Sequence, residues 1–272
     1  MKEKLKLAKT NYLIAVFLIL VSLSILYWFL TKQQEAESQE LTEEYMELTT
    51  KDSESILDRA KFITKRDGQV DIAVLGSSVT RGKGATAEQP VWGTRVEQRL
   101  NQYEEINAKV WNRGYNGYST TDLLVQEKIT ETIESKPDIV IFELCLINNN
   151  RFPQNDLSLT KEELIGIMNR FQENLPNTLV ILTTANPTIY NDIYLDNGTL
   201  TYDQYNDEVS AFVQKQGWNF IDIYSLMSRK IANSNHSLEY YLDDAVHPNG
   251  EGYNLWYTLL DERLSKPLSD LK

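Results

Sequence analysis

Residues 70–78 read Val-Asp-Ile-Ala-Val-Leu-Gly-Ser-Ser, an apolar run that leads directly into a Gly-Ser-Ser turn. A short apolar run bounded by turn residues predicts a buried β-strand. The turn would then present a serine hydroxyl at the carboxyl end of that strand, where open α/β sheets bind their ligands. We therefore interpret this stretch as the first strand of an α/β domain and the Gly-Ser-Ser turn as the source of a candidate nucleophile.

The rest of the chain alternates strand and helix patterns. Further apolar runs predict strands at Ala108–Asn112, Asp138–Leu144, Thr178–Thr183 and Phe220–Ile223. The longer helical period is found at Trp92–Tyr103, Thr121–Ser135, Lys161–Asn174, Tyr202–Gln216 and Gly250–Leu264. Such alternation predicts parallel βαβ units with right-handed crossovers. We expect one three-layer α/β/α domain with a mainly parallel five-stranded sheet from about residue 70 to 265.

The amino terminus carries an uncharged apolar run of nineteen residues, Tyr12–Leu30. As a helix it would cover about 28 Å, against a hydrocarbon core of roughly 30 Å. Lysines precede the run and glutamates follow it, so the positive-inside rule places residues 1–11 in the cytoplasm and the main domain outside. A cleaved signal peptide is the alternative, but its apolar region is normally shorter and ends in a small-residue site. We expect a single-pass anchor in the cell membrane, with residues 12–30 in the lipid bilayer.

Charge and cysteine content exclude several classes of protein. Residues 31–69 are polar, with glutamates at intervals of three or four, which indicates a charged helical stalk. The chain of 272 residues has a net charge of −12 and no basic stripe, which argues against nucleic-acid binding. An acidic substrate would need a local positive charge. The single cysteine, Cys145, excludes an intramolecular disulfide and is interpreted as a small buried hydrophobe.

Two histidines, His236 and His247, are available as general bases near neutral pH. His236 lies in a polar loop of turn residues, where a solvated imidazole is expected. His247 follows Asp244 by three residues, so that this carboxylate can hold and orient the ring. A serine hydroxyl becomes a nucleophile when an oriented base takes its proton, so a serine of the Gly76-Ser77-Ser78 turn could form a triad with His247 and Asp244. With two histidines and no metal-ligand spacing, we expect no metal and no cofactor.

Two familiar motifs are excluded at the serine turn. A P-loop needs Gly-Lys followed by Ser or Thr, but Gly84 follows Lys83. The nucleophile elbow Gly-x-Ser-x-Gly is excluded because Thr80 occupies its last position. By itself, a Gly-Ser turn is also typical of a loop without chemistry.

Four segments, in order, resemble the four sequence blocks of the SGNH/GDSL hydrolase superfamily. They are Gly76-Ser77-Ser78-Val79-Thr80-Arg81-Gly82, Asn112-Arg113-Gly114-Tyr115-Asn116-Gly117, Pro137–Glu143 leading into Asn148-Asn149-Asn150, and Asp244-x-x-His247-Pro248-Asn249. Each block alone is a weak signal, but all four in this order within an α/β pattern are specific. The resemblance implies a flavodoxin-like SGNH hydrolase domain over residues 70–272 and a serine esterase that works through an acyl-enzyme.

The resemblance also implies roles for individual residues. Ser78 would be the nucleophile, His247 the base, and Asp244 the group that orients the imidazole and stabilises its charged form. The oxyanion hole would be formed by the backbone N–H groups of Ser78 and Gly114 and by an asparagine side chain. A glycine suits this position because the backbone donor must approach the reacting carbonyl closely.

The chain departs from the superfamily pattern at two places. Ser77 stands where the first block has aspartate, which removes one carboxylate but no member of the triad. The third block lacks the glycine and the aspartate of Gly-x-Asn-Asp. Counting from Pro137 without gaps puts Ile147 at the asparagine position, so a shift of one residue is needed to place Asn148 in the oxyanion hole. Asn149 is the alternative.

The substrate is inferred from location. An enzyme outside the membrane and tethered by a polar stalk works close to the cell envelope, which favours an O-acetylated cell-surface carbohydrate. We expect Tyr115 and Tyr118 to contact it, because they follow Gly114 in the same loop. Lipid or lysophospholipid esters, acyl transfer to a sugar hydroxyl, and a non-catalytic glycan-binding module on the same fold are the alternatives. The oligomeric state stays open.

Overall fold

The apolar run at Val70 forms strand β1 (Val70–Gly76), which has a parallel neighbour on each side. The structure is a computed structural model that describes residues 2–49, 53–151, 154–190 and 199–271. The sheet has five parallel strands in the order β2-β1-β3-β4-β5, with β2 at Ala108–Gly114, β3 at Ile139–Glu143, β4 at Leu179–Thr183 and β5 at Phe220–Ile221. The predicted parallel five-stranded sheet is therefore confirmed.

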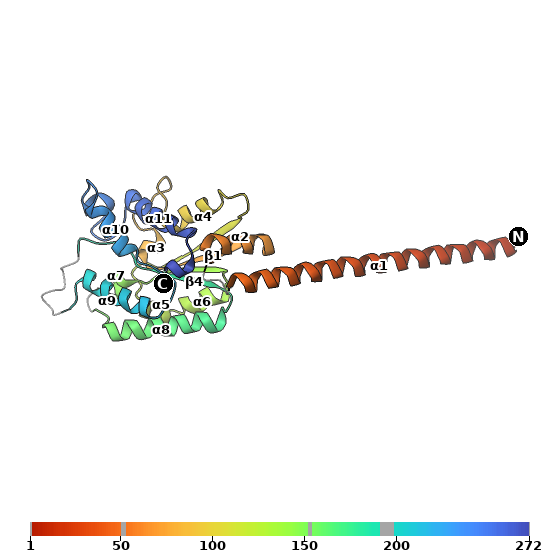
Figure 1. The fold of residues 1–272 in the computed structure, drawn as a ribbon, viewed down its shortest axis with the longest axis horizontal. Helices are drawn as coiled ribbons and strands as arrows, with labels where there is room; N and C mark the ends of the chain where they lie inside the picture. The colour runs from red at the N-terminus through yellow and green to blue at the C-terminus, as the bar shows by residue number, and fades with distance from the viewer. Residues whose placement is uncertain (1, 50–52, 152–153, 191–198, 272) are drawn as a thin grey trace. The chain divides into compact units, whose positions relative to one another are not determined.

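Helices cover both faces of this sheet, which confirms the predicted three layers (Figure 1). One layer contains α2 (Ile56–Asp67), α4 (Trp92–Leu100), α10 (Ile223–Ala232) and α11 (Gly250–Leu264). The other contains α5 (Thr120–Val125), α6 (Lys128–Glu134), α8 (Leu157–Asn174) and α9 (Tyr202–Lys215). The short helices α3 (Ser78–Arg81) and α7 (Leu146–Asn149) follow β1 and β3 directly, and 3-10 turns lie at Leu238–Tyr241 and Leu268–Leu271.

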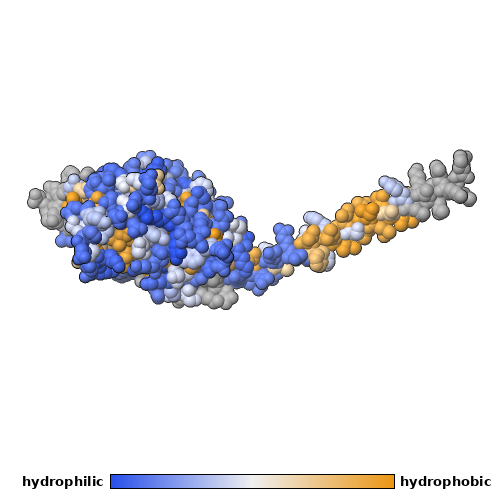
Figure 2. Space-filling view, turned by 90° about the horizontal axis from the view of Figure 1, so that it is seen from above, coloured by the Kyte–Doolittle hydropathy of each residue, from blue (hydrophilic) through white to orange (hydrophobic). Residues whose placement is uncertain are grey.

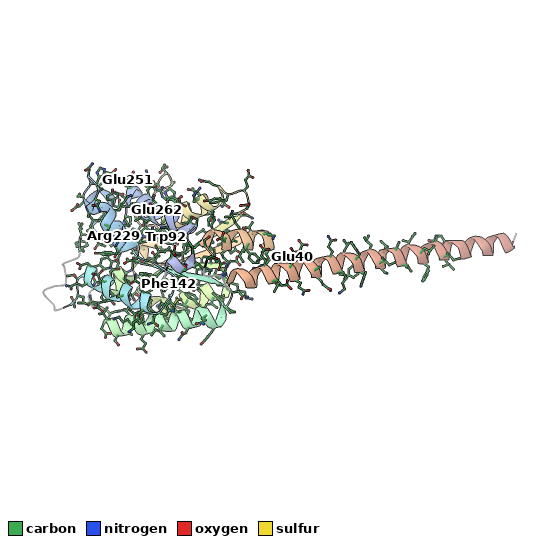
Figure 3. The ribbon with its side chains drawn as sticks, viewed as in Figure 1. Glu40, Trp92, Phe142, Arg229, Glu251 and Glu262 are labelled. Carbon is green, nitrogen blue, oxygen red and sulfur yellow. The ribbon has the colours of Figure 1, made fainter. Side chains whose placement is uncertain are left out.

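Each layer is packed by large buried side chains. Trp92 of α4 stacks on Trp256 of α11, with ring centroids 4.2 Å apart. Phe142 of β3, labelled with Trp92 in Figure 3, belongs to the core cluster on the other face, together with Phe171 of α8. Strands β1 and β3 are buried on both faces, so their side chains are almost all apolar. Polar side chains that act on a ligand are therefore expected at the carboxyl edge of the sheet.

Local capping changes two of the predicted boundaries. The sequence predicts one helix over Thr121–Ser135, but the structure has α5 and α6, separated at Glu127, whose φ of 58° is left-handed. The predicted fifth strand, Phe220–Ile223, is too long. Helix α10 begins at Ile223, and the side chain of Asp222 caps it by accepting the N–H of Ser225 at 3.1 Å.

The predicted stalk, residues 31–69, is too long at its carboxyl end. Helix α2 lies within that range and buries Phe62 and Ile63 in the core. Glu54 and Arg59 form a buried ion pair, with Arg59 Nη2 2.8 Å from Glu54 Oε2. The N–H of Leu268 donates to the carbonyl of Glu54 at 2.7 Å. The folded domain is therefore the compact unit Asp52–Lys272, and it begins before residue 70.

The other compact unit, Met1–Lys51, contains helix α1 (Lys2–Thr49). Its apolar side chains from Tyr12 to Leu30 are exposed along the helix (Figure 2). The segment Tyr12–Glu44 contains an 18-residue window with a mean hydropathy of 2.7, none of it buried. Among the described helices, α1 is the one long and apolar enough to cross a membrane, and a signal sequence near the amino terminus has the same properties.

A buried carboxylate joins the ends of β1 and β3. Glu143, the last residue of β3, accepts hydrogen bonds from the N–H of Ser77 at 2.7 Å, the N–H of Cys145 at 2.9 Å and the hydroxyl of Thr80 at 3.2 Å. Burial raises the pKa of this carboxyl, and these hydrogen bonds oppose the shift. Gly76 permits the approach, because a Cβ on it would lie 2.6 Å from Glu143 Oε2.

Replacing Glu143 with glutamine should destabilise the domain. The variant keeps the shape of the side chain, but its NH₂ group must face a group that is itself a donor. Because a buried donor then loses its acceptor, we expect the free energy of unfolding to fall by about 1–3 kcal/mol. Urea denaturation followed by circular dichroism measures it. Glu134→Gln, at an exposed position in α6, is the matched control and should change it by less than about 0.5 kcal/mol. Equal stability of Glu143→Gln and the wild type would contradict this account.

Candidate active site

The turn after β1 places Ser78 at the edge of the sheet. Ser78 is the first residue of α3, and the side chain of Ser77 caps that helix by accepting the N–H of Val79 at 3.3 Å. The helix ends after one turn at Gly82, whose φ of 99° suits a glycine C-cap. The backbone that carries Ser78 is therefore fixed by short-range hydrogen bonds at the carboxyl end of a buried strand.

The three residues of the candidate triad lie together. Ser78 Oγ is 2.9 Å from His247 Nε2. His247 Nδ1 is 2.9 Å from Asp244 Oδ1 and 2.8 Å from Asp244 Oδ2. In this arrangement Nδ1–H donates to the carboxylate, and Nε2 is left to accept the serine proton. The chemistry that the geometry permits is activation of the Ser78 hydroxyl by an oriented imidazole.

Asp244 is held in its ionised form. Burial alone would raise its pKa, but hydrogen bonds from the backbone N–H groups of His247 and Val246 and from the imidazole outweigh that effect and hold this pKa well below its usual range. Lys83 adds a positive charge, with Nζ 3.6 Å from Asp244 Oδ2. Among the described residues, no group of three or more His, Cys, Asp or Glu side chains is placed to hold a metal ion.

The loop that carries His247 is fixed by two asparagines. Asn249 Oδ1 caps helix α11 by accepting the N–H groups of Glu251 at 2.9 Å and Gly252 at 3.1 Å. Asn186, after β4, donates from Nδ2 to the carbonyl of Val246 at 2.8 Å. Asn249 is the last residue of the fourth sequence block, and it is also the N-cap of α11. Its capping role gives a physical reason for an asparagine at this position.

The structure corrects the assignment of Gly114 to an oxyanion hole. The Gly114 N–H donates to Asn112 Oδ1 at 2.9 Å, and Asn112 Nδ2 donates to the carbonyl of Thr80 at 2.8 Å. A Cβ on Gly114 would lie 2.5 Å from the carbonyl carbon of Thr80 and from Arg81 Cα. This glycine is therefore required for packing β2 against the serine turn, and its N–H already has an acceptor.

A pocket of about 460 Å³ opens beside Ser78 and His247. Gly117, three residues after Gly114, borders it, and its φ of +76° suits the tight turn that the Tyr118 N–H closes onto the Tyr115 carbonyl at 3.4 Å. Other lining residues are Lys83 after β1, Ile147, Asn148 and Arg151 at or just after α7, and Tyr190 and Tyr202 before or at the start of α9.

The third block brings Ile147 and Asn148 to this pocket and leaves Asn149 out of it. Asn149 is buried, and its side chain is fully used: Oδ1 accepts the Thr120 N–H at 2.9 Å, and Nδ2 donates to the hydroxyls of Thr120 and Thr160 at 2.7 and 3.0 Å. Asn148 Nδ2 donates to the Tyr118 carbonyl at 2.9 Å, which leaves a second N–H on the same nitrogen. Asn148 is therefore the asparagine of this pair with a side-chain donor to spare.

The structure places the two expected aromatic contacts outside the lining of this pocket. Tyr115 and Tyr118 stack on each other, with ring centroids 5.2 Å apart, and pack against the core, and neither is among the described residues that line the pocket. Tyr190 and Tyr202 line it instead, and no motif points to them. His236 is exposed, as predicted. Its ring stacks on that of Tyr240, with ring centroids 3.9 Å apart.

The comparisons with known proteins agree with this fold and its motifs. The model of the GDSL-like lipase/acylhydrolase family matches residues 74–255. No match was found among curated proteins.

Several solved structures have the same fold. A catalytic mutant of an acetylxylan esterase from Geobacillus stearothermophilus is 18% identical, with a TM-score of 0.59 over 73% of this chain and 95% of that chain. A two-domain esterase active on acetylated mannans, co-crystallised with mannopentaose, is 18% identical, with a TM-score of 0.58 over 79% of this chain and 56% of that chain. At such identities the likeness concerns the fold, whereas the family match covers most of the domain. The chain therefore belongs to the GDSL-like lipase/acylhydrolase family, within the SGNH/GDSL superfamily of ester hydrolases.

Proposed function

We propose that this protein is a serine esterase that removes O-acetyl groups from cell-surface carbohydrate through an acyl-enzyme intermediate. The observation that carries the proposal is the chain of contacts from Ser78 Oγ through the His247 ring to the Asp244 carboxylate, at the wall of an open pocket. In the first half-reaction, His247 takes the Ser78 proton while Oγ attacks the ester carbonyl, and then gives that proton to the departing alcohol. In the second, His247 activates a water that releases acetate.

The oxyanion of each step needs donors beside Ser78. The Ser78 N–H is available because it lies at the first position of α3, where helix N–H groups have no partner within the helix. We propose the Gly117 N–H as the second donor in place of Gly114, and Asn148 Nδ2 as the third. These residues all border the pocket, and a donor placed where charge develops is worth more in the transition state than in the ground state.

The carbohydrate substrate has two lines of support. The structural neighbours named above act on acetylated xylan and acetylated mannans. The pocket is also lined by Thr188, Asn116 and Asn150, whose hydroxyl and amide groups can bind sugar hydroxyls.

A fluorophosphonate probe tests the nucleophile, and acetate release tests the reaction. The probe should label the wild type and not Ser78→Ala, because it reacts with an activated serine hydroxyl. Acetate release from O-acetylated wall polysaccharide should require Ser78 and exceed the hydrolysis of long-chain esters.

Four results would contradict the proposal. Equal labelling of both proteins would remove Ser78 from the mechanism. Faster cleavage of long-chain esters would indicate a lipase, and movement of the acyl group to an added sugar would indicate a transferase. Glycan binding without turnover would indicate a binding module.

Asn148 and Asn149 give a matched pair for the oxyanion hole. Asn148→Ala should lower kcat about a hundred- to a thousandfold, because one transition-state donor is lost. Asn149→Ala should instead lower the melting temperature, because it removes three buried hydrogen bonds. Kinetics on an acetate ester and thermal unfolding of both variants separate the two effects. Unchanged kcat in Asn148→Ala would exclude its side chain from the hole.

We also propose that α1 anchors the enzyme, with the amino terminus in the cytoplasm and the domain outside. The lysines that support this orientation lie in residues 1–11, whose side chains are outside the described part of the chain. The described residues support it through the exposed apolar segment and the glutamates that follow it.

Fractionation tests the anchor. Full-length protein should stay in the membrane after washing with alkaline carbonate, because a spanning helix is held by its apolar side chains. A chain of residues 52–272 should be soluble and keep its activity. External protease should release the domain and leave a short protected fragment. Mature protein found in the medium, with a new amino terminus after the apolar run, would make the segment a signal peptide.

A further inference from the structure

The pocket beside Ser78 differs in charge from the chain as a whole. The chain has a net charge of −12, yet the described residues that line this pocket include two cations, Lys83 and Arg151, and no carboxylate. Lys83 is within 3.6 Å of the Asp244 carboxylate, so these two charges largely balance each other. The charge of Arg151 is left to set the potential of the pocket.

Arg151 is placed close to the reacting groups. It follows α7, and its N–H donates to the carbonyl of Asn148 at 3.3 Å, so its backbone is fixed to the helix that carries Asn148. Its side chain reaches Gly117, with Nη1 3.8 Å from the point where a Cβ on that glycine would stand. A ligand bound in the pocket therefore lies within reach of the guanidinium.

Arg151 is free to bind such a ligand. It is exposed, and among the residues that the structure describes it forms no ion pair. A guanidinium presents five N–H donors in a planar fork that matches the oxygens of a carboxylate or a phosphate. Lys83 carries three ammonium donors and faces the Asp244 carboxylate at an ion-pair distance of 3.6 Å.

We propose that Arg151, assisted by Lys83, binds an anionic group of the substrate, so that the enzyme acts on an ester in a molecule that also carries a carboxylate or a phosphate. The inference rests on the proposed esterase function and adds a substrate class to it. A negatively charged protein repels such a molecule at long range, and a local positive charge offsets that repulsion at the pocket. The acyl transfer itself is unchanged.

The test uses full-length protein and pairs of esters that differ only in charge. One pair is O-acetylated galacturonic acid oligosaccharides with and without methyl esters on their carboxyls, which reports on carboxylates. The other is O-acetyl glycerol phosphate and O-acetyl glycerol, which reports on phosphates. Acetate release gives the ratio of kcat/KM for the charged over the neutral ester. We expect this ratio to exceed one for the wild type in at least one pair.

Variants of Arg151 should change that ratio. In Arg151→Gln it should fall about ten- to hundredfold, the effect of removing a hydrogen bond to a charged group. Arg151→Lys keeps the charge without the planar fork, so it should restore part of the ratio. Lys215→Gln is the matched control, because Lys215 is exposed in the last turn of α9, about 20 Å along that helix from Tyr202 at the pocket.

Two kinetic outcomes overturn the inference. If the ratio is the same in Arg151→Gln and the wild type, Arg151 does not bind the anion. If Arg151→Gln loses activity equally on charged and neutral esters, the guanidinium acts on the reacting ester and not on a separate group.

A binding measurement separates failure of this inference from failure of the esterase function. Calorimetry with Ser78→Ala protein, titrated with galacturonic acid oligosaccharides and with glycerol phosphate, needs no turnover. The same titration is then made with protein that carries both Ser78→Ala and Arg151→Gln. If this second substitution weakens binding about tenfold or more, the anion subsite is supported even if no ester is cleaved. Binding that this substitution does not weaken, or an absence of binding to both ligands, overturns it.

Discussion

The buried carboxylate of Glu143 is the contact on which the candidate site depends. An unpaired carboxylate in an apolar core is costly, so its oxygens must find donors. One donor, the Ser77 N–H, lies in the turn that carries Ser78, and another, the Cys145 N–H, lies at the start of the helix that carries Asn148. The two segments that would supply the nucleophile and an oxyanion donor are therefore positioned by one side chain.

Much of the fold follows from local sequence, because strands buried on both faces must be continuously apolar. This is why β1, β3 and β4 are predicted to within a residue or two at each end. Helix α2 is different. Its N-cap box at Ser55 and Asp58 is readable, but it lies in a charged segment. Arg59 is buried in the folded domain, where it donates to the carbonyl of Asn177 at 3.1 Å. The charged residues of this segment therefore led us to predict an exposed stalk where helix α2 is packed into the domain.

The candidate site also has a part that the sequence predicts and a part that it does not. His247 lies three residues after Asp244, and Ser78 directly follows a buried strand, so we could predict from the sequence that these residues meet at the carboxyl edge of a parallel sheet. The choice between Gly114 and Gly117 could not be made from the sequence, because both lie in the same block. Their hydrogen bonds, their packing and their distance from the pocket distinguish them. The same holds for Asn148 and Asn149.

The residues that no motif predicted are those that would give the site its selectivity. Arg151, Tyr190 and Tyr202 come from segments after β3 and β4, where the superfamily pattern says little. Charge acts there on two length scales. The net charge of −12 repels anions at a distance, but salt screens that repulsion beyond about 8–10 Å. The charge of Arg151 acts inside that distance. The proposed site would therefore bind a carboxylate or phosphate beside the ester, because that group lies inside the pocket, where the charge of Arg151 is not screened.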